Sequence, residues 1–360
     1  MVLRQTSTFA LLSLLLIFLN SCDRLNSIDG ETGLSATGKV EEILVVCELG
    51  IWNDPDIRNQ LDTNLTQWIM PYLPDVATFT LIHKTPSHFT QGVKRYRNTV
   101  FLTIDSKYKG EKGSIVRKDD VWAKGQLVIE ITGRDFNQLM ETCRHGLDEV
   151  HDQFDYMAWK RIMDNFEKYK NSSAREQVRT NFGIDIVLPE GAAAVTRRTN
   201  FYRIEFPPES RPLEFVGSGT QDAGAIFSGV MVYQYDYLDS NQFILKNLLL
   251  ARDTMLKYNV PHETEGMYMG TQYNQFVYPE CNVAFSADGK IQGLDVRGMF
   301  YFTGKPKHST GGAFWAFHFI HPTRKKLMCI SGYVDAPPTT SWTYPLREVQ
   351  AVLRSVRIVK

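Results

Sequence analysis

Two histidine-containing segments have residues that could bind a metal ion. His318 and His321 are three residues apart, a spacing that places both side chains on one face of a helix. The surrounding segment, 313–320, is apolar and typical of a strand, in which residues three apart point to opposite faces. His262-Glu263 could begin a zinc-protease motif, but no second histidine stands four residues after the first. We therefore expect no metal site, with His318 in a strand and His321 in a loop before Pro322.

Other patterns associated with catalysis are incomplete. Gly217-Ser218-Gly219 is shorter than the G-x-S-x-G turn that presents a nucleophilic serine, so a flexible loop is the simpler interpretation. The acidic pairs Glu41-Glu42 and Asp119-Asp120 are adjacent in sequence and cannot be assigned to opposite sides of a substrate. The sequence contains no phosphate-binding loop and no dinucleotide fingerprint. It therefore indicates no catalytic set of residues and no cofactor.

Polar residues stand just before two expected strands and form the first candidate binding site. Arg97 and Asn98 precede one strand, and Trp122, Lys124 and Gln126 lead into another. If these strands are neighbours, the side chains line one cleft, in which Arg97 offers a planar set of donors to a carboxylate or phosphate and Trp122 offers a flat wall. In the alternative interpretation Arg97 pairs with carbonyl groups or an acid, and Trp122 simply packs.

A second and weaker candidate is a glycine pair near the end of the chain. Gly311-Gly312 is expected to form a turn, with Phe314 and His318 following it. Glycine lets the backbone approach a partner closely because it has no side chain. The turn is therefore a possible contact point for a ligand or a partner protein.

Cys22 is the residue whose chemistry the sequence defines best. Residues 1–8 carry one positive charge, on Arg4, and the apolar run 9–19 is too short to span a bilayer. The run ends in Leu19-Asn20-Ser21-Cys22, the pattern of a bacterial lipobox, in which the cysteine is lipidated and the chain is cut before it. We expect a signal peptide at 1–21 and an anchor of two or three acyl chains, such as palmitate, on Cys22.

The composition narrows the function classes. The sequence has 40 Lys and Arg residues against 40 Asp and Glu residues, and removal of the signal peptide takes away only Arg4. A nucleic-acid-binding protein would show a clustered basic excess, so we expect no nucleic-acid partner. The four other cysteines are expected to be buried thiols because two of them lie in apolar segments; one or more disulfides remain the alternative in an exported protein. These four are Cys47, Cys143, Cys281 and Cys329.

The chain after Cys22 is expected to form a tether and two domains. Residues 22–37 are polar and read as a flexible tether. The N-terminal domain, 38–171, contains strands near 42–47, 78–83, 99–104 and 126–132 and a helix from Pro55. It ends in an apolar seam with heptad-like spacing from Phe136 to Met157, which predicts a long helix or helical hairpin on its own sheet or, alternatively, a coiled-coil dimer interface.

The C-terminal domain, 172–360, begins after the break at Asn171. Strands are expected at 183–189, 200–206 and 229–237, then a helix to Asn259, several strand-like runs to Val334 and a final helix from Tyr344-Pro345. The fold class is α+β: first a mixed sheet with helices, then a mainly antiparallel sheet packed by helices. The strand ending in Leu188-Pro189, the meander and the closing helix are faintly similar to the Mog1/PsbP type of sandwich.

Several local patterns resemble an uncharacterised family of Bacteroidota envelope lipoproteins that has only a domain-of-unknown-function label. The patterns extend over nearly the whole mature chain: 41–46 with Trp52, Tyr72-Leu73-Pro74, Arg97-Asn98, 122–126, 182–189, Asn200-Phe201, 311–314 and 332–337. The chain departs from the family at Ala313, where proline is expected, and at Gly125. The resemblance implies an envelope location and this order of elements, and it implies no established activity.

These observations favour a non-catalytic envelope lipoprotein that binds a partner protein or a ligand, on the periplasmic side of the outer membrane. The alternatives are an envelope hydrolase acting on glycan, peptide or lipid, and a small-ligand or metal-binding module. A deep pocket that gathers titratable side chains would favour an enzyme. A broad apolar patch would favour a protein partner.

Overall fold

The computed structural model describes residues 34–71, 76–212, 223–273, 277–304, 311–336 and 341–359. Several predicted features lie outside these residues: the signal peptide, Cys22, the Gly217-Ser218-Gly219 loop and the family pattern at 72–74. The family pattern at 332–337 lies outside them only at Pro337. The chain divides into two compact units: one contains the residues up to Gln60 with Leu81–Leu147, and the other contains Leu61–Thr80 with Asp148–Lys360.

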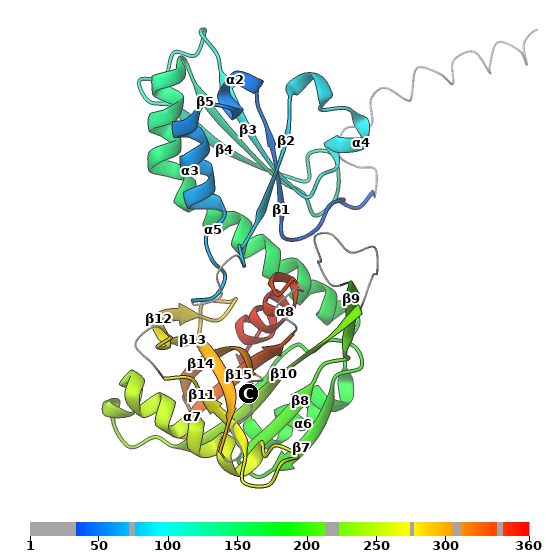
Figure 1. Cartoon of the computed structure of the whole chain (residues 1–360), viewed down its shortest axis with the longest axis vertical. Helices are drawn as coiled ribbons and strands as arrows, with labels where there is room; N and C mark the ends of the chain where they lie inside the picture. The colour runs from blue at the N-terminus through cyan, green and yellow to red at the C-terminus, as the bar shows by residue number, and fades with distance from the viewer. Residues whose placement is uncertain are drawn as a thin grey trace, which may run out of the picture. The chain divides into compact units, whose positions relative to one another are not determined.

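Unit 1 is built on a mixed sheet, as predicted, and this sheet has five strands in the order β2-β1-β3-β5-β4 (Figure 1). β1 is parallel to β3 and β3 is parallel to β5, whereas β4 is antiparallel to β5. β4 was not predicted, because it is an edge strand of mostly exposed, charged residues without an apolar alternation. The strands are β1 (Glu42–Val46), β2 (Thr80–Lys84), β3 (Asn98–Ile104), β4 (Ser114–Asp119) and β5 (Leu127–Gly133).

The helices of this part follow the expected signals. α3 (Pro55–Leu65) starts after Asp54, whose carboxylate accepts hydrogen bonds from the backbone N–H groups of Asp56 and Ile57, both at 3.0 Å. Short turns complete the unit: α2 (Leu49–Trp52), η2 (Pro86–His88) and α4 (Gln91–Lys94). The last residues of the expected tether are held by the unit, since the Ala36 and Thr37 N–H groups donate to the carbonyl oxygens of Lys124 and Arg95.

α5 (Phe136–Lys168) is one continuous helix of 33 residues, and α6 (Ser172–Phe182) follows it. Side chains of the predicted seam, such as Cys143, Leu147 and Phe154, are buried within the chain, which disfavours the coiled-coil dimer. Unit 1 ends within α5 at Leu147, and unit 2 continues from Asp148. Asn171, at the predicted break, is the N-cap of α6. The second part of α5 belongs to unit 2 because it forms contacts there, including the hydrogen bond between His151 Nε2 and Thr78 Oγ1 at 3.1 Å.

Unit 2 contains a nine-stranded antiparallel sheet, with the main order β11-β13-β14-β15-β10-β8-β7 (Figure 1). β9 pairs with β10 and β12 pairs with β13. Its strands are β7 (Ala193–Arg198), β8 (Phe201–Glu205), β9 (Glu209–Pro212), β10 (Ala223–Asp236), β11 (Tyr268–Thr271), β12 (Glu280–Phe285), β13 (Gln292–Thr303), β14 (Gly311–His321) and β15 (Lys326–Asp335). The mixed first sheet and the antiparallel second sheet with its helices confirm the predicted α+β class.

A separate two-stranded sheet joins the beginning and the end of this domain. β6 (Ile184–Asp185) pairs with β16 (Arg357–Ile358). The strand expected at 183–189 is therefore limited to two residues, because only these two find a partner strand.

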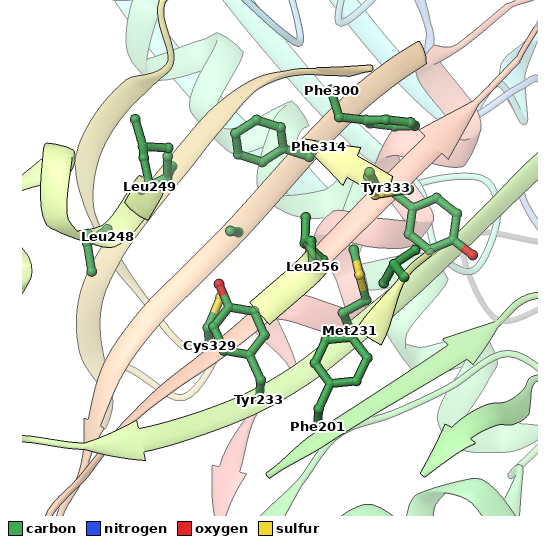
Figure 2. Packing of buried hydrophobic residues seen from close by; sticks show 14 of the residues in the cluster. Phe201, Met231, Tyr233, Leu248, Leu249, Leu256, Phe300, Phe314, Cys329 and Tyr333 are labelled. Carbon is green, nitrogen blue, oxygen red and sulfur yellow. The ribbon is translucent and has the colours of Figure 1, made fainter. Parts of the chain in front are cut away.

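Helices cover both faces of the nine-stranded sheet. α7 (Leu245–Asn259), which follows η3 (Ser240–Phe243), packs Leu248, Leu249 and Leu256 against the face formed by side chains such as Phe201, Tyr233 and Cys329 (Figure 2). α8 (Thr343–Arg354) lies on the opposite face, where Gly332 leaves room for Val349. Leu346, Val349 and Leu353 of α8 are buried, as their spacing predicted.

Among the described helices, none combines the length and the apolar character that crossing a membrane would require.

Candidate functional site

The first predicted cleft contains two amide side chains that hold the backbone of unit 1. β3 and β5 are neighbours, as the prediction required, with Asn98 opposite Leu127. The buried Asn98 amide donates to the carbonyl oxygens of Val40 and Glu42 at 3.1 and 2.9 Å. The buried Gln126 amide donates to the carbonyl oxygens of two residues before β3, at 2.6 and 2.7 Å. Both amides are therefore used within the fold.

The other residues of this predicted cleft also contribute to packing and backbone pairing. The ring of Trp122 packs edgewise against that of Phe89, with ring centroids 5.3 Å apart. The backbone N–H of Trp122 donates to the Gln126 side-chain oxygen at 3.0 Å. The backbone groups of Arg97 and Lys124 pair with residues 34–37, and the Lys124 side chain is exposed. The structure thus brings Trp122 and Gln126 together, in an arrangement that matches the alternative, structural interpretation.

The glycine pair of the second candidate lies in a strand, which corrects the expected turn. Gly311 and Gly312 are the first residues of β14 and pair with Tyr301 and Phe300 of β13. A Cβ atom on Gly312 would lie 2.0 Å from the Val334 carbonyl oxygen and 2.8 Å from the Phe300 ring. Glycine is therefore needed here so that the Phe300 ring can lie across β14.

His318 lies in the part of the sheet face that α7 covers, which we call the covered end. Its Nε2 atom is 3.6 Å from the Sγ atom of Cys329 on the neighbouring strand, and the hydroxyl group of Tyr233 contacts the same thiol (Figure 2). Burial raises the pKa of Cys329 to about 12 and lowers the pKa of His318 to about 3. A nucleophilic cysteine requires the opposite shifts, so this pair is a neutral thiol beside a neutral imidazole.

His321 has a different environment. Its side chain is buried and its Nε2 atom lies 3.1 Å from the carbonyl oxygen of Gly183. His321 is the last residue of β14 and not a loop residue, which corrects the prediction. Because successive side chains of a strand alternate between the two faces of the sheet, His318 and His321 point to opposite faces, as their spacing predicted. Cys47, Cys143, Cys281 and Cys329 are all free thiols, in agreement with the predicted buried thiols, although Cys281 is only partly buried.

A buried arginine on α7 completes the covered end. The Arg252 Nη1 atom donates to Thr271 Oγ1 at 2.7 Å, and its guanidinium carbon lies 3.8 Å from the centroid of the Phe314 ring. Burial lowers the pKa of Arg252. This arginine is enclosed by the helix and the sheet and takes no part in an open site.

The same sheet face continues into an open pocket of about 330 Å³, which none of the α7 residues lines. We call this part the open end. Its lining comes from five strands and the loop after β8, and it combines aromatic rings with a few charged groups: Arg203, Glu205, Phe206, Pro208, Phe227, Ser228, Met269, Phe300, Phe302, Tyr333 and Asp335. Figure 2 shows Phe300 and Tyr333 at this end of the cluster.

Arg203 links the two strands on either side of β10. Its Nη2 atom is 2.8 Å from Glu205 Oε1 and donates a hydrogen bond to the Tyr333 hydroxyl group at 3.5 Å. The cross-strand partner of both Glu205 and Tyr333 is Gly229, which places the three residues on one sheet face. A Cβ atom on Gly229 would lie 3.0 Å from the Tyr333 hydroxyl group, so glycine makes room for the tyrosine to cross β10.

Asp335 is the second carboxyl group that lines the pocket, and its surroundings differ from those of Glu205. It lies opposite Phe227 in the β10–β15 ladder, and burial raises its pKa. The pKa of the neighbouring Tyr333 is also raised by burial, an effect that the positive charge of Arg203 partly offsets. The pocket thus holds one carboxylate paired with an arginine and a second, partly buried one.

Sequence reasoning missed Arg203, Glu205, Tyr333 and Asp335 as site residues. A signal was present, because charged residues alternate with apolar ones in 200–206, a segment that otherwise reads as a half-buried strand. Tyr333 and Asp335 also lie within one of the patterns that carried the family resemblance, 332–337. Without the strand order, the two segments could not be placed beside each other.

Two family models match separate parts of the chain. Residues 36–167 match the model "Domain of unknown function (DUF8532)", and residues 171–355 match "Domain of unknown function (DUF4837)". The predicted resemblance to a family with only such labels is confirmed. No curated protein matches the chain.

Among solved structures, the chain is similar to the Saccharomyces cerevisiae Ran-binding protein Mog1p. The identity is 13%, the TM-score is 0.30, and the match covers 49% of this chain and 90% of that one. A point mutant of the protein Mog1 matches with 12% identity and a TM-score of 0.28, covering 49% and 91%. The model that matches residues 171–355 covers more than half of the chain, and the protein therefore belongs to the DUF4837 family of domains of unknown function.

Proposed function

We propose that this protein is a non-catalytic, ligand-binding lipoprotein of the bacterial cell envelope, anchored through lipid on Cys22. The observation that carries the binding role is the pocket at the open end of the unit 2 sheet. Its volume of about 330 Å³ lies within the usual range for small-molecule sites. Aromatic walls with a few polar groups are the usual lining of such sites.

The charged groups of the pocket favour binding over catalysis. The Glu205 carboxylate is paired with Arg203 at 2.8 Å, and this ion pair fixes its position. The nearest cysteine and histidine pair on the same sheet face, Cys329 and His318, is neutral and enclosed. These groups are suited to orienting a bound molecule.

One observation favours a second candidate, an envelope hydrolase acting on a glycan. Two carboxyl groups, Glu205 and Asp335, line one pocket in unlike surroundings, and burial raises the pKa of Asp335. Glycoside hydrolases use such a pair as a general acid and a base or nucleophile. Release of reducing sugar from purified envelope glycan, lost in Asp335→Asn, would replace the binding proposal with this one.

The anchoring part of the proposal is supported by the lipobox pattern at Leu19-Asn20-Ser21-Cys22. The expected result is that the full chain, produced in a bacterium fed an alkyne-labelled palmitate, carries the label and sediments with the membranes. Cys22→Ala should lose the label and stay in the soluble fraction. Labelling of Cys22→Ala at the wild-type level would contradict the anchor.

The pocket is tested with the mature chain in a soluble form that starts at Asp23 and so lacks the lipidated Cys22. This chain is screened against a library of small envelope-derived molecules by ligand-observed NMR. Phe227 stands at the rim and is 55% exposed, so Phe227→Ala removes a pocket wall with little effect on folding. Phe285→Ala is the matched control, because Phe285 is 50% exposed on β12 and does not line the pocket.

We expect ligands that bind the wild type and Phe285→Ala, and bind Phe227→Ala about tenfold more weakly. Ligands with equal affinity for all three proteins would place the binding site elsewhere. The absence of any ligand sensitive to Phe227 would remove the support for a small-molecule function and favour a protein partner.

A further inference from the structure

We propose that the pocket at the open end selects small organic cations, molecules in which an ammonium group is attached to a compact apolar body. This inference rests on the proposed ligand-binding function and adds the chemical class of the ligand. It follows from the charges, the aromatic rings and the burial of the lining residues.

The first step is the charge balance of the lining. Among its described side chains one is basic, Arg203, and two are acidic, Glu205 and Asp335. Arg203 already has a carboxylate partner, since its Nη2 atom is 2.8 Å from Glu205. In the part of the chain that the structure describes, no basic side chain forms an ion pair with Asp335. An ionised Asp335 therefore leaves the described lining with a net negative charge.

The second step is the cost of that charge. Burial raises the pKa of Asp335, which means that the surroundings disfavour its ionised form. A cation placed beside the carboxylate would offset this cost. An anionic ligand would instead bring a further negative charge close to Asp335 and Glu205. The lining therefore discriminates by the sign of the ligand's charge.

The third step is the aromatic wall. Phe227, Phe300, Phe302 and Tyr333 line the pocket, and the electron-rich faces of aromatic rings attract ammonium groups. The chain already uses this attraction, since the guanidinium carbon of Arg203 lies 5.6 Å from the centroid of the Tyr333 ring. A carboxylate combined with aromatic rings favours a weakly hydrated cation such as an alkylammonium over an inorganic one.

The experiment compares choline with its neutral carbon isostere, dimethylbutanol, by calorimetric titration of the mature chain. The two probes have nearly the same shape and differ in charge. We expect choline to bind about tenfold or more tightly than dimethylbutanol, the ratio that a cation–aromatic contact with a partly desolvated carboxylate typically provides. Choline affinity should also rise as the pH rises through the raised pKa of Asp335, because only the ionised carboxyl attracts the cation.

Asp335→Asn should weaken choline binding about tenfold and leave dimethylbutanol binding unchanged. Asp236→Asn is the matched control, since Asp236 lies at the other end of the β10–β15 ladder, is exposed and pairs with Lys326 at 2.6 Å. Equal affinities for the two probes in the wild type, or an unchanged choline affinity in Asp335→Asn, would overturn the cation class.

The failure of this inference can be told apart from the failure of the pocket function. If neutral molecules bind in a manner that depends on Phe227 while choline does not bind, the pocket stands and its ligand class is wrong. If neither probe nor any other small molecule depends on Phe227, both the ligand class and the small-molecule function are wrong.

Discussion

The covered end and the open end of the unit 2 sheet have similar residue types and different chemistry. Both contain an arginine, a tyrosine and aromatic rings: Arg252 of α7 and Tyr233 of the sheet at the covered end, and Arg203 and Tyr333 in the pocket. At the covered end α7 excludes water and the cysteine and histidine stay neutral. At the open end Arg203 forms an ion pair and the carboxyl groups line a cavity.

This difference shows that residue types alone do not define a site. A cysteine 3.6 Å from a histidine would suggest a nucleophile if only the distance were known. Desolvation reverses that interpretation, because it disfavours both the thiolate and the imidazolium ion. Charged groups that can contact a ligand lie at the open end, which α7 does not cover.

The strongest test of the covered end is the reactivity of Cys329. A pKa of about 12 instead of 9.0 leaves about a thousandfold less thiolate at neutral pH, and burial limits access further. We expect iodoacetamide to alkylate Cys329 at least a thousandfold more slowly in the native protein than in urea, as measured by mass spectrometry. Cys281, which is only partly buried, should react faster than Cys329 in the native state. Rapid labelling of Cys329 in the native protein would show an activated thiol. The covered end would then not be the unreactive part of the sheet face.

The next test removes part of the helix that makes the difference. Leu256→Ala in α7 deletes a fully buried side chain and should lower the free energy of unfolding by roughly 2–5 kcal/mol. Leu250→Ala is the control on the same helix, because Leu250 is 64% exposed; its effect should stay within about 0.5 kcal/mol. Urea denaturation followed by circular dichroism measures both. Similar losses in the two variants would mean that α7 does not seal the sheet as described.

The smallest expected effect concerns the open end and its pH dependence. Because burial raises the pKa of Asp335, its protonated form favours the folded state; this contribution to stability is present at low pH and is lost as the pH rises through that pKa. Asp335→Asn should therefore raise the Tm at neutral pH, through a gain of at most about 1 kcal/mol in the free energy of unfolding. The difference should vanish below the ordinary carboxyl pKa. A Tm that falls at neutral pH in this variant, measured beside Asp236→Asn, would reveal a cationic partner for Asp335.

Much of the fold could be predicted because long buried elements leave periodic patterns. The apolar seam of α5 and the face of α8 follow helical spacing, and β5 and β10 show strand patterns. β4 and β7 were missed, since they are largely exposed and carry several charged residues. Apolar periodicity in a sequence reflects burial of side chains. It therefore cannot predict a strand that is held mainly by backbone hydrogen bonds.

The site could not be predicted for a different reason. The pocket depends on β8, β10 and β15 being adjacent and on the register that places Gly229 between Glu205 and Tyr333. Pairings across more than a hundred residues are set by tertiary structure. In the predicted cleft, sequence reasoning could not show that the amide groups of Asn98 and Gln126 donate to backbone carbonyl oxygens, because those partners lie far away in the sequence.

The pairing of β6 with β16 has a consequence for how these two segments respond to cleavage. Ile184 and Ile358 are partners in that small sheet, and the N–H group of Val359 donates to the carbonyl oxygen of Gly183. The two strands form a separate two-stranded sheet, so each depends on the other for its pairing. A protease that removes the segment after α8 would therefore also free β6. Damage to one of the two strands thus spreads to the other, which is far from it in the sequence.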